Sequence, residues 1–247
     1  MKTKEYFDQT ADEYLAAYDR QDDLRSFIFS ERKRIVFELF DAPGGTVLDI
    51  GCGPGVFTDR LSQLKCRTYG VDLSQKMAAL AQNRGFPLSI FMVGGIIQLP
   101  FKDSSFDSVL CSGVLEYLTD VEPAIKEMFR VLKPGGRLIV TFPNKSSWLN
   151  LLDQFSRRLI RFLQRLNLPV EKHINPDYSP GYLSPRRLNR LLNQNGFVVE
   201  AVKFHIFRLT LLNKISPDCS LKLARRMNFV RGRFLGINAV VRARRIK

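Results

Sequence analysis

The chain has 247 residues, of which 45% are hydrophobic, and carries a formal net charge of +14 at pH 7. This length is sufficient for one large hydrophobic core, and α/β chains of this size usually form a single domain. The N-terminus has no apolar leader, and no run reaches the roughly 18 apolar residues of a spanning helix, so we expect a cytoplasmic protein. Without CxxC pairs, we expect the four cysteines to be reduced thiols. They are Cys52, Cys66, Cys111 and Cys219.

The positive charge belongs to one half of the chain. Residues 1–145 contain 18 Lys and Arg against 19 Asp and Glu, a net of −1. Residues 146–247 contain 20 against 5, a net of +15. We therefore expect a near-neutral scaffold followed by a segment that faces an anionic partner.

Two helices are predicted ahead of the first strand, over residues 3–20 and 26–40. The stretch VLDIGCGPG, residues 47–55, then indicates a buried strand that stops at a glycine-rich turn. Gly51, Gly53 and Gly55 let the backbone approach a ligand, and Asp49 is an acid where a core residue is expected. A helix over residues 56–64, with free N–H groups at its start, should follow. Similar turns occur in dinucleotide-binding folds and as plain tight turns, so this pattern alone leaves the ligand open.

A second acid follows the turn at an informative spacing. Residues 69–73, YGVDL, predict a short buried strand that ends in Asp72. A carboxylate at this place can accept hydrogen bonds from both hydroxyls of a ribose. The alternative is that Asp72 is the N-cap of the next helix, a role for which Ser74 is the rival.

The remaining pattern alternates helices and strands. Helices are predicted over residues 75–84, 121–132 and 184–195. Strands are predicted over residues 88–93, 106–112, 137–142, 197–207 and about 235–241, the last two as an antiparallel edge. We therefore expect an α/β fold, a Rossmann-like doubly wound, seven-stranded, mostly parallel sheet with an antiparallel last strand and an amphipathic helical insertion. The organisation expected is a lid at 1–40, a core at 41–145, the insertion at 146–182 and the rest of the sheet at 183–247.

Four stretches carry a resemblance to a known family: VLDIGCGPG, YGVDLS, LPFKDSSFDSVLCSGVLEYL and VLKPGGRLIVTFPN. In this order they resemble the class I S-adenosylmethionine (SAM) dependent methyltransferases, of the type 11-like group that methylates small molecules in quinone biosynthesis. The resemblance covers residues 6–144 and implies SAM as the cofactor. It places the methionine end of SAM on the turn, the ribose on Asp72 and the adenine beside the third strand. The residues implied are Asp49, Gly51, Cys52, Gly53, Gly55, Asp72, Leu73, Gly95, Ile96 and Ser112, with Tyr14 or Arg32 reaching the SAM carboxylate; core packing is the alternative for the last two.

The chain departs from this family at two places. Relatives usually have an acid for the adenine amino group where this chain has Gly95, so we expect weaker cofactor binding. Quinone O-methylating relatives hold a divalent metal with Glu-x-x-Glu-His, whereas the aligned residues here are Gly113, Glu116 and Tyr117, so no metal site is expected. The nucleic-acid base methylation signatures D/N-P-P-Y and Pro-Cys are absent.

Residues 146–166, SSWLNLLDQFSRRLIRFLQRL, separate into two faces when wound as a helix. One face carries Trp148, leucines and phenylalanines, and the other carries Arg157, Arg158, Arg161 and Arg165. The helix is either a lid or dimer contact with solvated arginines, or an interfacial helix on an anionic membrane surface. The resembled quinone enzymes have a membrane-contacting insertion here.

The chain contains two histidines. His173 matches a histidine of the resembled family that faces the methyl acceptor, where it would remove a hydroxyl proton; chance surface placement is the alternative. His205 lies in an alternating strand and is interpreted as structural. Three functions follow: a methyltransferase for a small hydrophobic or lipid-linked acceptor, peripheral at the inner membrane face; an RNA or protein methyltransferase using the basic half; or a SAM-binding non-catalytic partner.

Overall fold

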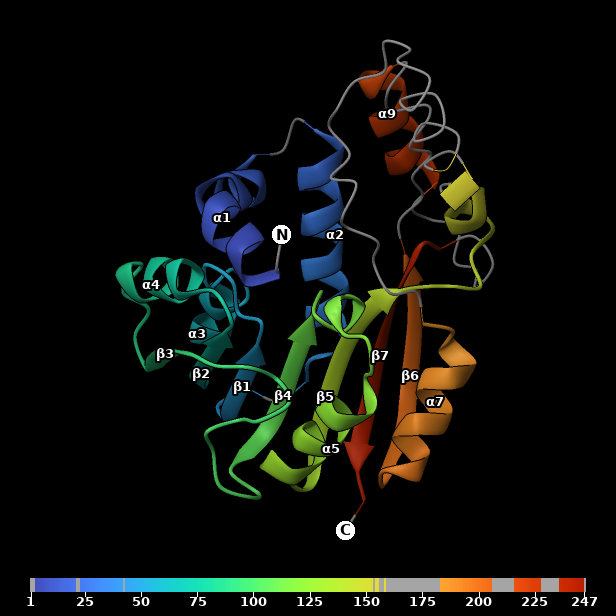
Figure 1. Cartoon of the computed structure of the whole chain (residues 1–247). Helices are drawn as coiled ribbons and strands as arrows, with labels where there is room; N and C mark the ends of the chain where they lie inside the picture. The colour runs from blue at the N-terminus through green and yellow to red at the C-terminus, as the bar shows by residue number, and fades with distance from the viewer. Residues whose placement is uncertain are drawn as a thin grey trace.

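Seven strands form one sheet in the order β3-β2-β1-β4-β5-β7-β6 (Figure 1). The computed structural model describes residues 3–20, 23–41, 43–152, 154, 155, 158, 183–205, 216–227 and 236–246. The strands are β1 Thr46–Ile50, β2 Arg67–Asp72, β3 Ser89–Val93, β4 Phe106–Ser112, β5 Leu132–Pro143, β6 Phe197–His205 and β7 Asn238–Arg245. β7 runs antiparallel to both of its neighbours, β5 and β6, whereas the pairs among β1 to β5 are parallel. The predicted fold class is therefore confirmed.

The helices cover both faces of the sheet. They are α1 Thr3–Asp19, α2 Leu24–Leu39, α3 Thr58–Gln63, α4 Gln75–Asn83, α5 Glu122–Val131, α7 Pro185–Gln194 and α9 Pro217–Met227, with a 3-10 turn η1 at Leu115–Tyr117. On one face α5 and α7 pack on alternate residues of the strands, such as Leu48, Val109 and Val140. On the other, α2 and α3 pack on the residues between them, such as Val47 and Leu110. Strands buried on both sides explain the nearly continuous apolar runs of the sequence.

The C-terminal ends of the parallel strands gather at one edge of the sheet, where α1 and α2 lie (Figure 1). Ligands of doubly wound folds bind outside this edge. The strand order reverses direction at β1, because β2 lies on one side of it and β4 on the other. The Asp49 and Asp72 strand ends are therefore neighbours, as the sequence predicted.

Several element boundaries differ from the predicted ones. The strand expected at residues 137–142 already begins at Leu132, because Leu132 pairs with Phe106 ahead of a register shift in the ladder between β4 and β5. The helix expected from residue 56 begins at Thr58 because the preceding glycine turn is longer. Helix α9 lies in the basic C-terminal half of the chain and was not predicted.

The start of the insertion is fixed to the sheet by two buried asparagines. Asn144 donates to the Gly236 carbonyl, and Asn150 donates to the carbonyls of Asn144 and Ile237 at 2.8 and 2.7 Å. Residues 148–152 are helical, as predicted. The rest of the predicted helix lies mostly outside the described residues.

Candidate cofactor site

A cavity of about 320 Å³ opens at the C-terminal edge of the strands. Its walls come from the ends of β1, β2 and β4, from the loop after β3, from η1 and from helix α1. This volume lies at the lower end of the range for small-molecule sites. The lining is largely apolar, and among the described residues that form it Asp72 is the only one with a carboxylate.

The glycine turn after β1 is held by its own hydrogen bonds. The amides of Gly51 and Cys52 both donate to the Val71 carbonyl, and the Gly55 amide donates to the Cys52 carbonyl. Gly51, Gly53 and Gly55 have φ of +68°, +53° and +76°, a region that favours glycine. The backbone of this turn is therefore free of side chains at the three glycines, as expected. The donors at these positions, however, are already used within the protein, so the turn offers a ligand close approach more than free N–H groups.

Asp49 is an acid without a partner in the core. It is 1% exposed, and neither carboxylate oxygen has a hydrogen-bond partner. The pKa of Asp49 is raised to about 7, mainly by burial and to a smaller extent by the nearby Asp72 carboxylate. Asp49 does not itself line the cavity, but the next two residues of the chain do. An unpaired buried carboxylate at this point favours a cationic ligand.

Asp72 connects the two strand ends. One of its oxygens accepts from the Gly53 amide and the other from the Ser74 amide, both at 2.8 Å. Burial raises the pKa of Asp72, and these two amides act in the opposite direction. The alternative reading of Asp72 as the helix cap was wrong, because Ser74 caps α4 through the Met77 amide. Asp72 is thus held facing the cavity by backbone donors.

The wall after β3 consists of Gly94, Gly95, Ile96 and Ile97. A Cβ placed on Gly95 would meet no atom within 4 Å, and Gly95 does not have a positive φ. Side chains therefore fit at this position, and the absence of an acid is not imposed by space. Ile97 is 61% exposed, so this wall is the more open one.

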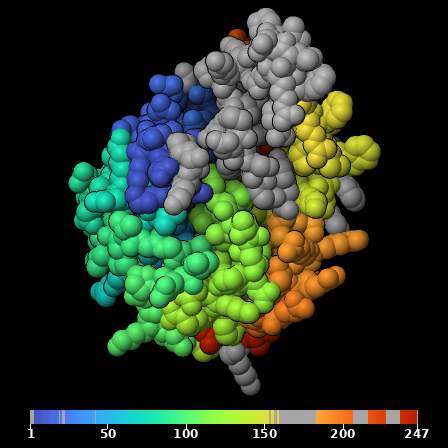
Figure 2. All heavy atoms as spheres, viewed as in Figure 1, coloured from blue at the N-terminus to red at the C-terminus, as the bar shows by residue number. Residues whose placement is uncertain are grey.

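Helix α1 closes the cavity from above. Phe7 and Tyr14 line it and lie edge to face with their centroids 6.0 Å apart, and Phe7 also meets the Tyr117 ring of η1 at 5.2 Å. Asp8 accepts from the Ser74 hydroxyl at 2.6 Å, which ties α1 to the first turn of α4. In Figure 2 the blue surface of α1 accordingly adjoins the teal surface of α4. Helix α1 therefore covers part of the cavity, and its role as a lid over the cofactor stays a prediction.

A second buried polar group lies beside β4. Arg32 is 9% exposed, donates to the Tyr18 hydroxyl at 2.8 Å and has a buried Nε without a partner. Its Nη1 lies 2.8 Å from the place of a Cβ on Gly113, so only glycine fits there without displacing the guanidinium. Glu116 has an unpartnered Oε2, and burial raises the pKa of this carboxyl.

The structure brings most of the predicted cofactor residues together. Those that line the cavity are Tyr14, Gly51, Gly53, Asp72, Leu73, Gly95, Ile96 and Ser112. Four predicted residues are not among the lining residues: Asp49, Cys52, Gly55 and Arg32. Phe7, Tyr117 and Met77 also line the cavity and were not predicted as site residues.

The remaining site predictions have different outcomes. His173 lies outside the described residues. His205 is 2% exposed, and its pKa is lowered to about 3, mainly by burial and to a smaller extent by the positive charges of Arg32 and Arg34. Both of its ring nitrogens lack a partner. Within the described part of the chain, no three His, Cys, Asp or Glu side chains gather in a group suited to a metal ion.

A doubly wound sheet with two acids at the tips of β1 and β2 defines a nucleotide-binding class of protein. The family model described as "Methyltransferase domain" matches residues 48–140. A demethylmenaquinone methyltransferase of Corynebacterium glutamicum (strain R) is 34% identical over 175 residues, which are 67% of this chain and 73% of that protein. A 2-phytyl-1,4-naphtoquinone methyltransferase of Thermosynechococcus vestitus is 29% identical over 204 residues, 76% of this chain and 88% of that protein.

A solved structure agrees on the fold. The magnesium protoporphyrin IX methyltransferase of Synechocystis PCC 6803 with bound SAH superposes with a TM-score of 0.67 at 21% identity, over 98% of this chain and 97% of that one. The chain belongs to the class I SAM-dependent methyltransferases. It is an enzyme of this class, and its cofactor is SAM.

Proposed function

We propose that SAM lies across the tips of β1 and β2, with its methionine end at the glycine turn and its adenine against Gly95 and Ile96. The observation that carries this proposal is the unpartnered, buried Asp49 carboxylate beside Asp72. SAM carries two cationic groups, the sulfonium and the ammonium, so a buried anion near its amino-acid end is complementary to it. The hydroxyls of the ribose would be hydrogen-bond donors to Asp72, whose oxygens retain acceptor capacity beyond their two amide bonds.

Bound SAM would supply a methyl group on a cationic sulfur; the acceptor would attack the methyl carbon in line, and the sulfur would leave as the thioether of S-adenosylhomocysteine. The chain's own contribution is alignment of the two reactants and exclusion of water, which together account for much of the rate of such reactions. Phe7, Tyr14 and Tyr117 form the aromatic cover that keeps water from the reacting atoms. Where the acceptor needs deprotonation, we propose His173 as the base.

We further propose that the acceptor is a hydrophobic or lipid-linked small molecule. The cavity lining beyond the two strand tips and the wall after β3 is apolar and aromatic, and it contains Val114, Tyr117 and Leu118. Both curated relatives described above are named as methyltransferases of quinone-type compounds. An apolar wall selects an apolar acceptor because its surface leaves water on binding.

The test of this activity is methyl transfer from labelled SAM into fractionated lipid extracts and into total RNA. We expect label in an organic-soluble product. Label in RNA alone would refute the proposed acceptor class. If neither extract is methylated although SAM binding has been demonstrated, the result would favour the hypothesis of a non-catalytic SAM-binding protein.

We propose that the insertion brings the enzyme to a membrane surface. In the described start of the insertion Trp148, Leu151, Leu152 and Phe155 are all exposed, at 65%, 52%, 52% and 67%. Figure 2 shows this yellow segment projecting at the edge of the molecule above α7. Among the described residues, no helix combines the length and apolar character that crossing a bilayer requires. Exposed apolar side chains next to a basic segment favour contact with anionic headgroups.

Flotation with vesicles of anionic phospholipid tests this contact. The double change Trp148→Ser and Phe155→Ser should release the protein from the vesicles, while Ile246→Ser, at another residue that is 48% exposed, should not. If the double variant and the Ile246→Ser variant float equally well, the proposed membrane contact of Trp148 and Phe155 would be refuted. RNA retention at matched salt separates general polyanion binding from lipid contact.

A further inference from the structure

We propose that Glu127 and Arg130 of α5 are positioning residues that fix the adenine wall of the SAM site from outside the cavity. The inference rests on the proposed placement of SAM. Neither residue lines the cavity, and neither belongs to a sequence motif that points to the cofactor.

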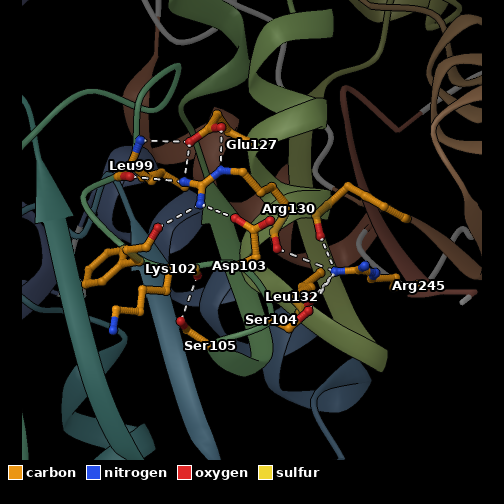
Figure 3. A network of polar contacts seen from close by, with 11 residues as sticks. Leu99, Lys102, Asp103, Ser104, Ser105, Glu127, Arg130, Leu132 and Arg245 are labelled. Carbon is orange, nitrogen blue, oxygen red and sulfur yellow. Dashed lines mark hydrogen bonds and ion pairs between the residues drawn. The ribbon is translucent and has the colours of Figure 1, made fainter.

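All three nitrogens of the Arg130 guanidinium donate hydrogen bonds, to the loop at residues 99–103 and to Glu127 on the same helix (Figure 3). Its Nη1 donates to the Phe101 carbonyl at 2.7 Å and to Asp103 at 2.8 Å, and its Nη2 donates to the Leu99 carbonyl at 3.1 Å. Its Nε and Nη2 donate to the two oxygens of Glu127, both at 2.8 Å. These are five hydrogen bonds from a side chain that has five N–H donors in a rigid fork.

Glu127 completes the attachment of the same loop. Its Oε2 accepts from the Leu99 amide at 2.9 Å, so both backbone polar groups of Leu99 are bound by this pair. The hydrogen bonds from Arg130 and Leu99 lower the pKa of Glu127, which therefore stays ionised at neutral pH. A charged acceptor and a charged donor make stronger hydrogen bonds than neutral groups do.

The clamped residue is directly connected to the cavity wall. Gly94 to Ile97 line the cavity, and the Gln98 amide donates back to the Gly95 carbonyl at 3.3 Å, which closes a turn one residue before Leu99. Leu99 is 4% exposed and Ile96 is 8% exposed, so both ends of this turn are anchored in the core. Ile97 and Gln98 are the exposed residues of this turn, and Gly95 is half-buried with no atom within 4 Å of the place of a Cβ.

The clamp matters more here because of Gly95. A side-chain carboxylate could follow the adenine amino group by rotating about its own bonds. Backbone groups and an isoleucine have no such freedom, so the position of the loop decides the fit to the base. The pair on α5 sets that position, and it does so without contacting SAM.

The change Arg130→Lys keeps the charge and removes the fork, since an ammonium has three donors at a single point. We expect about tenfold weaker binding of S-adenosylhomocysteine in calorimetry. We expect the same factor for 5′-methylthioadenosine, which retains the adenosine and lacks the amino acid. Amide exchange in residues 94–101 of the free enzyme should accelerate. The matched control is Lys126→Met on the same helix, which removes an ion pair with Glu122 and touches no loop residue; its affinities should match the wild type.

Glu127→Gln serves as a second, milder variant, because it leaves the three bonds from Arg130 to the loop in place. It should weaken both ligands about threefold. Unchanged affinities in Arg130→Lys and Glu127→Gln, with only a lower melting temperature, would overturn the proposal, as would a loss confined to S-adenosylhomocysteine. If the wild-type enzyme itself bound neither ligand, the proposed SAM site would fail, which distinguishes the two failures.

Discussion

The tips of β1 and β3 form two ends of one cavity, and they are built in opposite ways. At the tip of β1 the space is full: a Cβ on Gly51 would lie 2.2 Å from Cγ2 of Val114, and the backbone has a φ of +68°. At the tip of β3 a Cβ on Gly95 would meet nothing within 4 Å. The first end is fixed by its own backbone, and the second is fixed by side chains of α5.

Two glycines that follow strand ends of the same sheet can therefore differ in whether the structure requires glycine at all. Gly51 is required by conformation and by close packing, whereas nothing in the geometry requires Gly95. Substitutions at the β1 tip should therefore be harmful, and substitutions at the β3 tip should be tolerated or should improve binding.

The largest effect is expected for Gly51→Ala. The added methyl group would collide with Val114. The alanine would also have to adopt a positive φ, and this backbone strain alone costs about 1–3 kcal/mol. We expect at least a hundredfold loss of SAM affinity in calorimetry. Gly85→Ala is the control, because Gly85 has a φ of +65° with open space around it. It should lower stability and leave SAM binding intact; equal losses in both variants would mean that strain alone is responsible.

Asp49→Asn should separate stability from binding at the same tip. Because the folded-state pKa of Asp49 is raised to about 7, the wild-type fold loses stability as the pH rises from about 4 through 7. The amide variant should therefore be more stable than the wild type at pH 8, by up to roughly 4 kcal/mol, with little difference at pH 4. Its SAM affinity at pH 8 should fall tenfold or more.

Urea denaturation at the two pH values, together with calorimetry, measures both effects of the Asp49→Asn change. A variant that is less stable at pH 8 would contradict the view that Asp49 is an unpaired buried acid in the free enzyme.

The smallest effect is a gain. Gly95→Asp should place a carboxylate beside the adenine amino group and strengthen SAM binding about fivefold. Gly95→Ala adds the Cβ alone and should leave the affinity unchanged. If Gly95→Asp instead weakened binding, the β3 tip would not be the adenine wall.

Much of the fold was predictable because strands buried on both faces produce apolar runs that stop at turns. The stretch before Gly51 and the stretch before Leu73 show this most clearly, and both strand ends lie where the sequence placed them. The amphipathic helix α9 was missed because the basic residues of the C-terminal half were interpreted only as a surface for an anionic partner.

The site was predictable only in part. Asp72 and the glycines stand in a spaced pattern along the chain, so their proximity follows from parallel strands. The unpartnered state of Asp49 and the occupied amides of the turn depend on tertiary hydrogen bonds, which no local pattern encodes. The Glu127 and Arg130 clamp joins residues about 30 positions apart in the chain, and on the sequence alone both side chains are ordinary charges of an amphipathic helix.

The most direct measurement is calorimetric titration of S-adenosylhomocysteine into the wild-type enzyme and into Asp72→Ala. The account predicts one ligand bound per wild-type chain and no measurable binding to the variant, provided that circular dichroism shows a folded protein. Undiminished affinity in a folded Asp72→Ala variant would contradict the placement of SAM at the tips of β1 and β2.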